Sequence, residues 1–123
     1  MPVADSRIIE AMEDLIEANR AARQVMCAGE MVLQQGIERL RAGEKLSETL
    51  ADRPAGSQRQ ATQEANERIV DARHNLRLLL IGRCLEEGMR PWAIADAWGM
   101  SRQRVDRYIQ EIKRDSENVD RTI

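Results

Sequence analysis

The sequence lacks phenylalanine altogether and contains one tyrosine, two tryptophans and three prolines among 123 residues. The alternation of β-branched or aromatic residues with polar ones that marks strands is missing, whereas strong helix formers dominate. We therefore predict an all-α fold. The longest apolar run covers only residues 78–81, and the N-terminus lacks an apolar run of signal-peptide length. We accordingly expect a cytoplasmic protein that makes no membrane contact.

Side chains that carry catalysis or bind metals are also scarce. Cys27 and Cys84 are isolated from each other and from the pairings typical of zinc or redox sites, so we expect two reduced thiols. His74 is the only histidine and is expected to be an ordinary residue on a helix surface. We find no nucleophile with a neighbouring base, no glycine-rich phosphate loop and no carboxylate cluster. The sequence therefore predicts no enzymatic activity, no metal and no cofactor.

Charge is distributed unevenly along the chain, whose formal net charge is -2. Residues 68–114 carry ten basic and six acidic side chains, whereas residues 1–56 carry seven basic and ten acidic ones. A local excess of positive charge suits contact with phosphates, while the remainder of the chain would repel nucleic acid. An alternative is that these arginines form a solvated face with partners on the same helix.

Residues 91–114, PWAIADAWGMSRQRVDRYIQEIKR, have the spacing of two helices that cross over a short turn. Ala95 is small where the helices would touch, Gly99 tolerates positive φ at the turn, and Ser101 can cap the first turn of the second helix. The remaining apolar positions would form the core of the motif: Ile94, Trp98, Val105, Tyr108, Ile109 and Ile112.

Residues 95–108, ADAWGMSRQRVDRY, resemble the helix-turn-helix of bacterial and phage transcription regulators and the promoter-reading domain of sigma factors. The resemblance implies binding to double-stranded DNA, usually as a dimer on an inverted repeat. Residues at the start of the second helix would then enter the major groove, where Arg, Gln and Asp side chains can contact base edges. We expect base contacts from Arg102, Gln103, Asp106 and Arg107. We expect phosphate contacts from Ser101, Arg104, Lys113 and Arg114.

Residues 6–41 contain no proline and predict a long helix of the coiled-coil type. Two lines of residues alternate in steps of four and three, and both are expected to lie in one seam. Such a helix must either fold back against the next helix or pair with another chain. We predict a homodimer held by a seam made of Ile8, Met12, Leu15, Asn19, Met26, Leu33 and Leu40. Asn19 either specifies the pairing or points to solvent.

Glycine, proline and polar residues between positions 42 and 60 predict a break, with a short helical turn over residues 46–51. A second long helix should follow from residue 57 or 58 to 87 and end at Gly88, with Pro91 opening the next helix. We therefore predict a helical dimerisation arm with a linker over 1–56, a second long helix leading into a tri-helical DNA-binding domain over 57–114, and a polar tail over 115–123.

Together these features favour a sequence-specific, homodimeric transcriptional regulator that acts by occluding a promoter or by recruitment there, with RNA polymerase as a further candidate partner. One alternative is a DNA-organising or segregation protein that bridges DNA with little sequence preference. Another is a sigma-like module that binds protein only.

Overall fold

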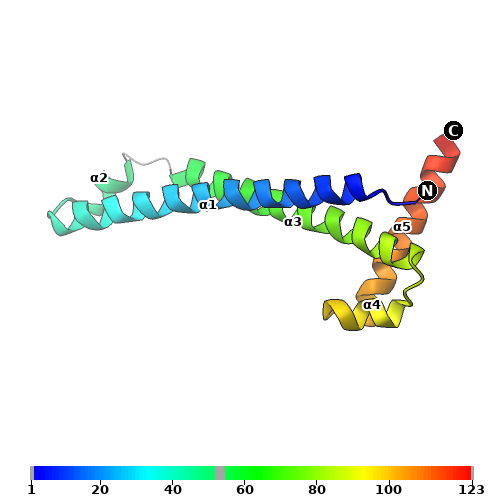
Figure 1. Cartoon of the computed structure of the whole chain (residues 1–123). Helices are drawn as coiled ribbons and strands as arrows, with labels where there is room; N and C mark the ends of the chain where they lie inside the picture. The colour runs from blue at the N-terminus through cyan, green and yellow to red at the C-terminus, as the bar shows by residue number, and fades with distance from the viewer. Residues whose placement is uncertain (1, 52–54, 123) are drawn as a thin grey trace. The chain divides into compact units, whose positions relative to one another are not determined.

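The structure of the chain, a computed structural model, describes residues 2–51 and 55–122, with backbone only for residues 55 and 119–122. All secondary structure in these residues is helical, which confirms the predicted fold class (Figure 1). The helices are α1 (Asp5–Arg41), α2 (Leu46–Ala51), α3 (Ala55–Glu86), α4 (Pro91–Trp98) and α5 (Arg102–Thr122). The short turn expected over residues 46–51 is thus a helix with those bounds, and residues 115–122 of the expected tail continue α5.

The chain divides into two compact units, and each boundary falls inside a long helix. The core unit comprises residues 1–13 and 73–123, and the arm unit comprises residues 14–72. This division differs from the predicted one, which separated the units at the linker near residue 56. The first half of α3 belongs to the arm because it lies along α1 there, with contacts made by Gln58 and Arg68.

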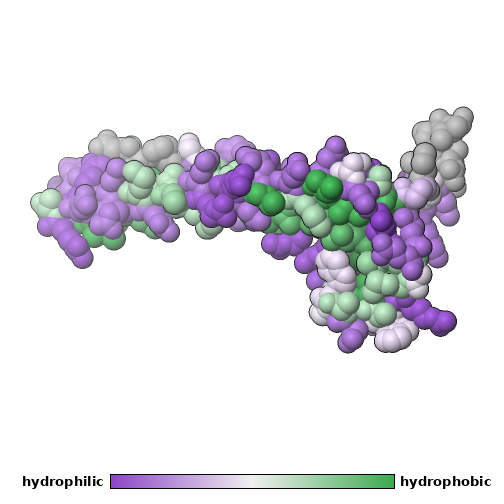
Figure 2. All heavy atoms as spheres, viewed as in Figure 1, coloured by the Kyte–Doolittle hydropathy of each residue, from purple (hydrophilic) through white to green (hydrophobic). Residues whose placement is uncertain are grey.

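The core unit is built from large apolar side chains at the end of α3, in α4 and in α5. Ile81, Ile94 and Val105 are fully buried, and Ala95 and Tyr108 join them in one cluster. On the face drawn in Figure 2, hydrophobic residues gather where these three helices meet. Partly buried side chains surround the cluster: Leu78, Cys84, Leu85, Met89, Met100, Ile109 and Ile112. Burial of this kind is the main stabilising contribution in a small helical domain.

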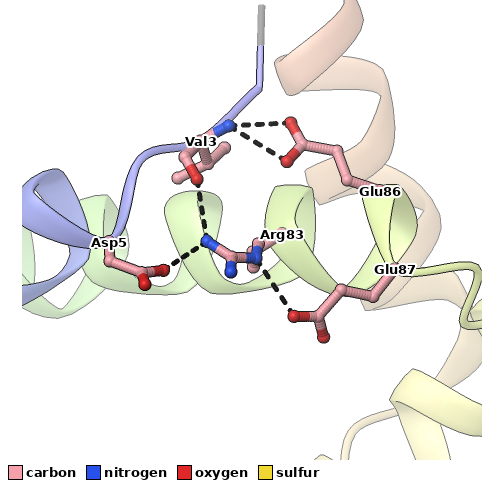
Figure 3. A network of polar contacts seen from close by, with 5 residues as sticks. All are labelled: Val3, Asp5, Arg83, Glu86 and Glu87. Carbon is pink, nitrogen blue, oxygen red and sulfur yellow. Dashed lines mark hydrogen bonds and ion pairs between the residues drawn. The ribbon is translucent and has the colours of Figure 1, made fainter.

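A polar network closes the core unit where the chain enters α1 (Figure 3). The Val3 amide donates to both carboxylate oxygens of Glu86, at 2.9 and 3.0 Å. The Arg83 guanidinium donates to the Val3 carbonyl at 3.0 Å, to Asp5 at 2.5 Å and to Glu87 at 3.0 Å. Hydrogen bonds to Asp5 and then Glu87 raise the pKa of Arg83. This network ties the first residues of the chain to the end of α3.

In the arm unit, α1 and α3 run side by side in opposite directions (Figure 1). The Gln58 amide donates to the Val25 carbonyl at 3.1 Å, and Arg68 lies 3.8 Å from the Asp14 carboxylate. A Cβ added at Gly29 would lie 2.9 Å from the Gln58 amide nitrogen. Gly29 therefore allows the Gln58 side chain to reach the backbone of α1.

Small residues, alanine and glycine, occupy half of the positions on the buried face of α1. Ala11, Ala18 and Ala22 are buried, and the same face continues through half-buried positions that alternate in steps of three and four. We call this the inner face; it consists of residues 8, 11, 15, 18, 22, 25, 29, 32, 36 and 39. Small side chains allow two helices to approach closely, which explains why alanine and glycine are concentrated there.

Most of the large apolar residues of α1 lie on a different face. Its positions also alternate in steps of three and four, and all are exposed except Asn19, which is half-buried. We call this the outer stripe; it consists of Ile9, Met12, Ile16, Asn19, Arg23, Met26, Glu30, Leu33, Ile37 and Leu40. On the face drawn in Figure 2, hydrophobic residues lie on the surface of the arm among hydrophilic ones.

The structure therefore divides the predicted single seam between two faces of α1. Ile8 and Leu15 belong to the inner face and are half-buried within the chain, whereas Met12, Met26, Leu33 and Leu40 belong to the outer stripe.

None of the described helices is both long and apolar enough to cross a membrane.

Candidate nucleic-acid interface

The turn between α4 and α5 has the backbone that the sequence predicted. Gly99 adopts φ +62°, a left-handed conformation that disfavours residues with a Cβ. The Met100 amide donates to the Ala95 carbonyl at 3.0 Å, and the Gly99 amide to the Asp96 carbonyl at 3.4 Å. These two bonds satisfy carbonyls at the end of α4 and direct the chain into α5.

Ser101 caps the first turn of α5, as predicted. Its hydroxyl oxygen accepts a hydrogen bond from the Arg104 amide at 3.1 Å. The hydroxyl proton is not needed for this bond, so it can still be donated to a phosphate. The Ser101 hydroxyl can therefore cap the helix and still donate the predicted hydrogen bond to a phosphate.

α5 separates an apolar face from a polar one. Val105 and Tyr108 are buried, and Ile109 and Ile112 pack against the same cluster. At 100° per residue the opposite face carries Gln103, Arg107, Gln110 and Arg114, all of which are exposed. Gln110 lies in the middle of this polar face, although the sequence reasoning assigned it no contact.

Arg102 and Asp106 lie together on one flank of the polar face. The Arg102 Nε donates to the Asp106 carboxylate at 3.2 Å, and both side chains are about half exposed. Pairs spaced four apart at a helix surface contribute only about 0.2 to 0.5 kcal/mol to stability. The main effect of this pair is therefore to orient the Arg102 guanidinium.

The other flank of α5 faces α3 across His74. The His74 Nε2 donates to Glu111, 3.0 Å from each carboxylate oxygen, and the His74 and Tyr108 ring centroids lie 5.2 Å apart. His74 is thus a link between α3 and α5 rather than the ordinary surface residue expected. Sequence reasoning missed the pair because its members lie 37 residues apart.

An open cleft of about 470 Å³ adjoins this pair. Three arginines contribute to its lining, and none of them forms an ion pair with the residues that the structure describes. The lining consists of His74, Arg104, Arg107, Tyr108, Gln110, Glu111 and Arg114. Unpaired guanidinium groups that converge beside a polar helix face can bind phosphate oxygens.

The structure therefore gathers most of the predicted contact residues around one helix, but on different sides of it. Gln103 and Arg107 share the exposed polar face, and Arg104 and Arg114 line the cleft. Lys113 is exposed on the flank of Arg102. Trp98, expected in the core, is 37% exposed, so it covers the edge of the core rather than filling it.

No protein-family model matches this chain, and no curated protein and no solved structure is significantly similar to it. Interpretation of the polar face of α5 therefore depends on its own chemistry.

Proposed function

We propose that the protein binds double-stranded DNA with α5 in the major groove. The supporting observation is that a well-packed core of α3, α4 and α5 leaves one face of α5 exposed and rich in arginine and glutamine. The capped, glycine-containing turn before α5 is the arrangement expected of a helix-turn-helix. Rigid support of this kind is what a groove-reading helix needs.

The side chains divide by the contacts they can make. Gln103 and Arg107 reach base edges, since Gln can pair with adenine and Arg with guanine through two hydrogen bonds each. Arg102, oriented by Asp106, is a further base contact. Phosphates are bound by the side chains of Ser101, Arg104, Lys113 and Arg114. Gln110 extends the reading face by one turn.

In this proposal the protein is a homodimeric, cytoplasmic transcriptional regulator. It acts by occluding a promoter or by recruitment there. Binding through two linked sites raises affinity, because the second contact becomes intramolecular. Such a regulator requires no chemistry of its own, and contact with RNA polymerase would follow from its position on DNA.

Selection of bound sites from a random duplex library, followed by binding measurements at two salt concentrations, tests the proposal. A regulator selects a defined motif that retains affinity in higher salt. A DNA-organising protein binds every duplex and loses affinity steeply with salt, because its contacts are to phosphates. A module that binds protein only selects nothing, and that outcome would overturn the proposal.

Substitutions on α5 sharpen this test. Gln103→Ala or Arg107→Ala should cost about 1 to 3 kcal/mol on the selected site and relax base preference at individual positions. Lys113→Ala should weaken all duplexes alike and reduce the salt slope by about one unit. Arg59→Ala, which removes an exposed arginine from the arm unit, is the charge-matched control and should leave binding unchanged.

A further inference from the structure

We propose that a second copy of the chain docks on the outer stripe, with the two α1 helices antiparallel. The proposal rests on the homodimer suggested above, but it does not depend on DNA binding. The stripe keeps the spacing of a two-stranded coiled coil over ten successive positions, from Ile9 to Leu40. Its apolar members are between 43% and 70% exposed, although the inner face of the same helix is covered.

The polar residues of the stripe decide the direction of pairing. In a parallel pair each position meets its own copy, so Arg23 would face Arg23 and Glu30 would face Glu30 across the seam. Like charges held opposite each other in a partly dehydrated seam are destabilising. A parallel pair therefore opposes two layers of equal charge in the middle of the stripe.

An antiparallel pair centred between residues 24 and 25 removes both conflicts. Asn19 then lies opposite Glu30 of the partner subunit, and its amide can donate to that carboxylate. Arg23 lies opposite Met26 of the partner subunit, one layer from the same carboxylate. The guanidinium and the carboxylate thus approach with opposite charge.

In the same register, each of the remaining layers of the stripe pairs two apolar residues. Ile16 faces Leu33 of the partner subunit, and this layer, like the two polar ones, lies within the arm unit. Further along the same helix, Met12 faces Ile37 of the partner subunit and Ile9 faces Leu40 of the partner subunit. One register therefore places apolar residues opposite apolar ones, except in the layer of Arg23 and Met26, and brings opposite charges together at the polar positions.

Matched lysine substitutions test whether the stripe is the interface. Leu33 and Met31 are 70% and 64% exposed on the same helix, but only Leu33 belongs to the stripe. Neither substitution disturbs a buried contact within the chain. In sedimentation equilibrium, Leu33→Lys should raise the dimer dissociation constant at least tenfold, whereas Met31→Lys should change it less than twofold. Equal effects of the two, or a wild-type monomer at tens of micromolar, would overturn the proposal.

Cysteine cross-linking tests the direction. In a Cys27→Ser background, Ile16→Cys and Leu33→Cys are prepared singly, then oxidised alone and as an equimolar mixture without DNA. Antiparallel pairing predicts a disulfide-linked dimer only in the mixture, because position 16 meets position 33 of the partner subunit. Bridges in each single variant alone would show parallel pairing and overturn the proposed direction.

Controls keep the outcome unambiguous. The background protein alone reports any product formed through Cys84. A link between residues 16 and 33 of one chain is excluded, since no chain in the mixture carries both cysteines. Failure of DNA binding leaves these results unchanged, so the two proposals fail separately.

Discussion

The core unit and the arm unit contain helices of similar kind but bury different residues. In the core unit the fully buried side chains are the large Ile81, Ile94 and Val105. In the described part of the arm unit the buried apolar residues are Ala18, Ala22 and, at its boundary, Ala72. Full burial of a large aliphatic side chain contributes about 1.5 to 3 kcal/mol, and alanine contributes much less. The core unit is therefore stabilised by large buried side chains, whereas the arm depends on close helix contact and leaves many of its large apolar residues exposed.

The strongest test of this difference is a truncation in the core unit. Ile94→Ala should lower the free energy of unfolding by about 2 to 5 kcal/mol, because it removes a fully buried side chain and leaves a cavity. Urea denaturation followed by circular dichroism, at fixed protein concentration, measures the change. Val70→Ala, at a site 60% exposed in the arm, is the control and should shift stability by less than about 0.5 kcal/mol. Similar effects at both sites would contradict the comparison.

The inner face of the arm should respond to enlargement instead. Ala22→Leu should destabilise the protein by about 1 to 3 kcal/mol, because the larger side chain would force α1 away from the helix packed on its inner face. The matched substitution Ala28→Leu places the same side chain at an exposed position of the same helix. Thermal melts should show a lower Tm for the first variant only. If Ala22→Leu were as stable as Ala28→Leu, the inner face would not be closely packed.

A third test concerns the turn that supports α5. Gly99→Val should cost about 1 to 3 kcal/mol, because φ is positive there, and it should also abolish DNA binding by misplacing α5. Gly56→Val, at a glycine whose φ is not positive and whose added Cβ meets no atom within 4 Å, should change neither property. Melting and gel-shift assays read the two effects. Normal DNA binding by a destabilised Gly99→Val protein would separate the turn from function.

The smallest effect should distinguish the two thiols. Burial, with a smaller contribution from the charge of Glu87, raises the pKa of the half-buried Cys84 thiol. Less Cys84 is therefore thiolate at pH 8, and iodoacetamide should modify the exposed Cys27 faster. Peptide mass mapping gives both rates, and in denaturant the difference should disappear. Faster alkylation of Cys84 in the folded protein would contradict the packing described around it.

The sequence predicted the local structure well because its signals are local. The bounds of α2, the positive φ at Gly99 and the cap at Ser101 each depend on neighbours within a few residues. Pro91 opens α4 for the same reason.

The faces of α1 could not be assigned with the same certainty. The line through Ile8, Leu15 and Ala22 can form a face with the residues three positions later, such as Ala11 and Ala18. It can equally form a face with the residues four positions later, such as Met12, several of which are large. Both choices give a regular coiled-coil spacing. The predicted seam followed the second choice, whereas the residues buried within the chain follow the first, because contact through alanine depends on how closely the second helix approaches. The link between His74 and Glu111 was missed for a related reason, since only the packing of α3 against α5 brings those residues together.

The two faces of α1 also imply two different rules for sequence change. Positions such as Ala18 and Ala22 on the inner face should tolerate exchange among alanine, glycine and serine, but not larger residues. Positions such as Ile16 and Leu33 on the outer stripe should exchange freely among leucine, isoleucine, methionine and valine. The two faces of one helix would then tolerate different sets of residues, one limited by side-chain volume and the other by hydrophobicity.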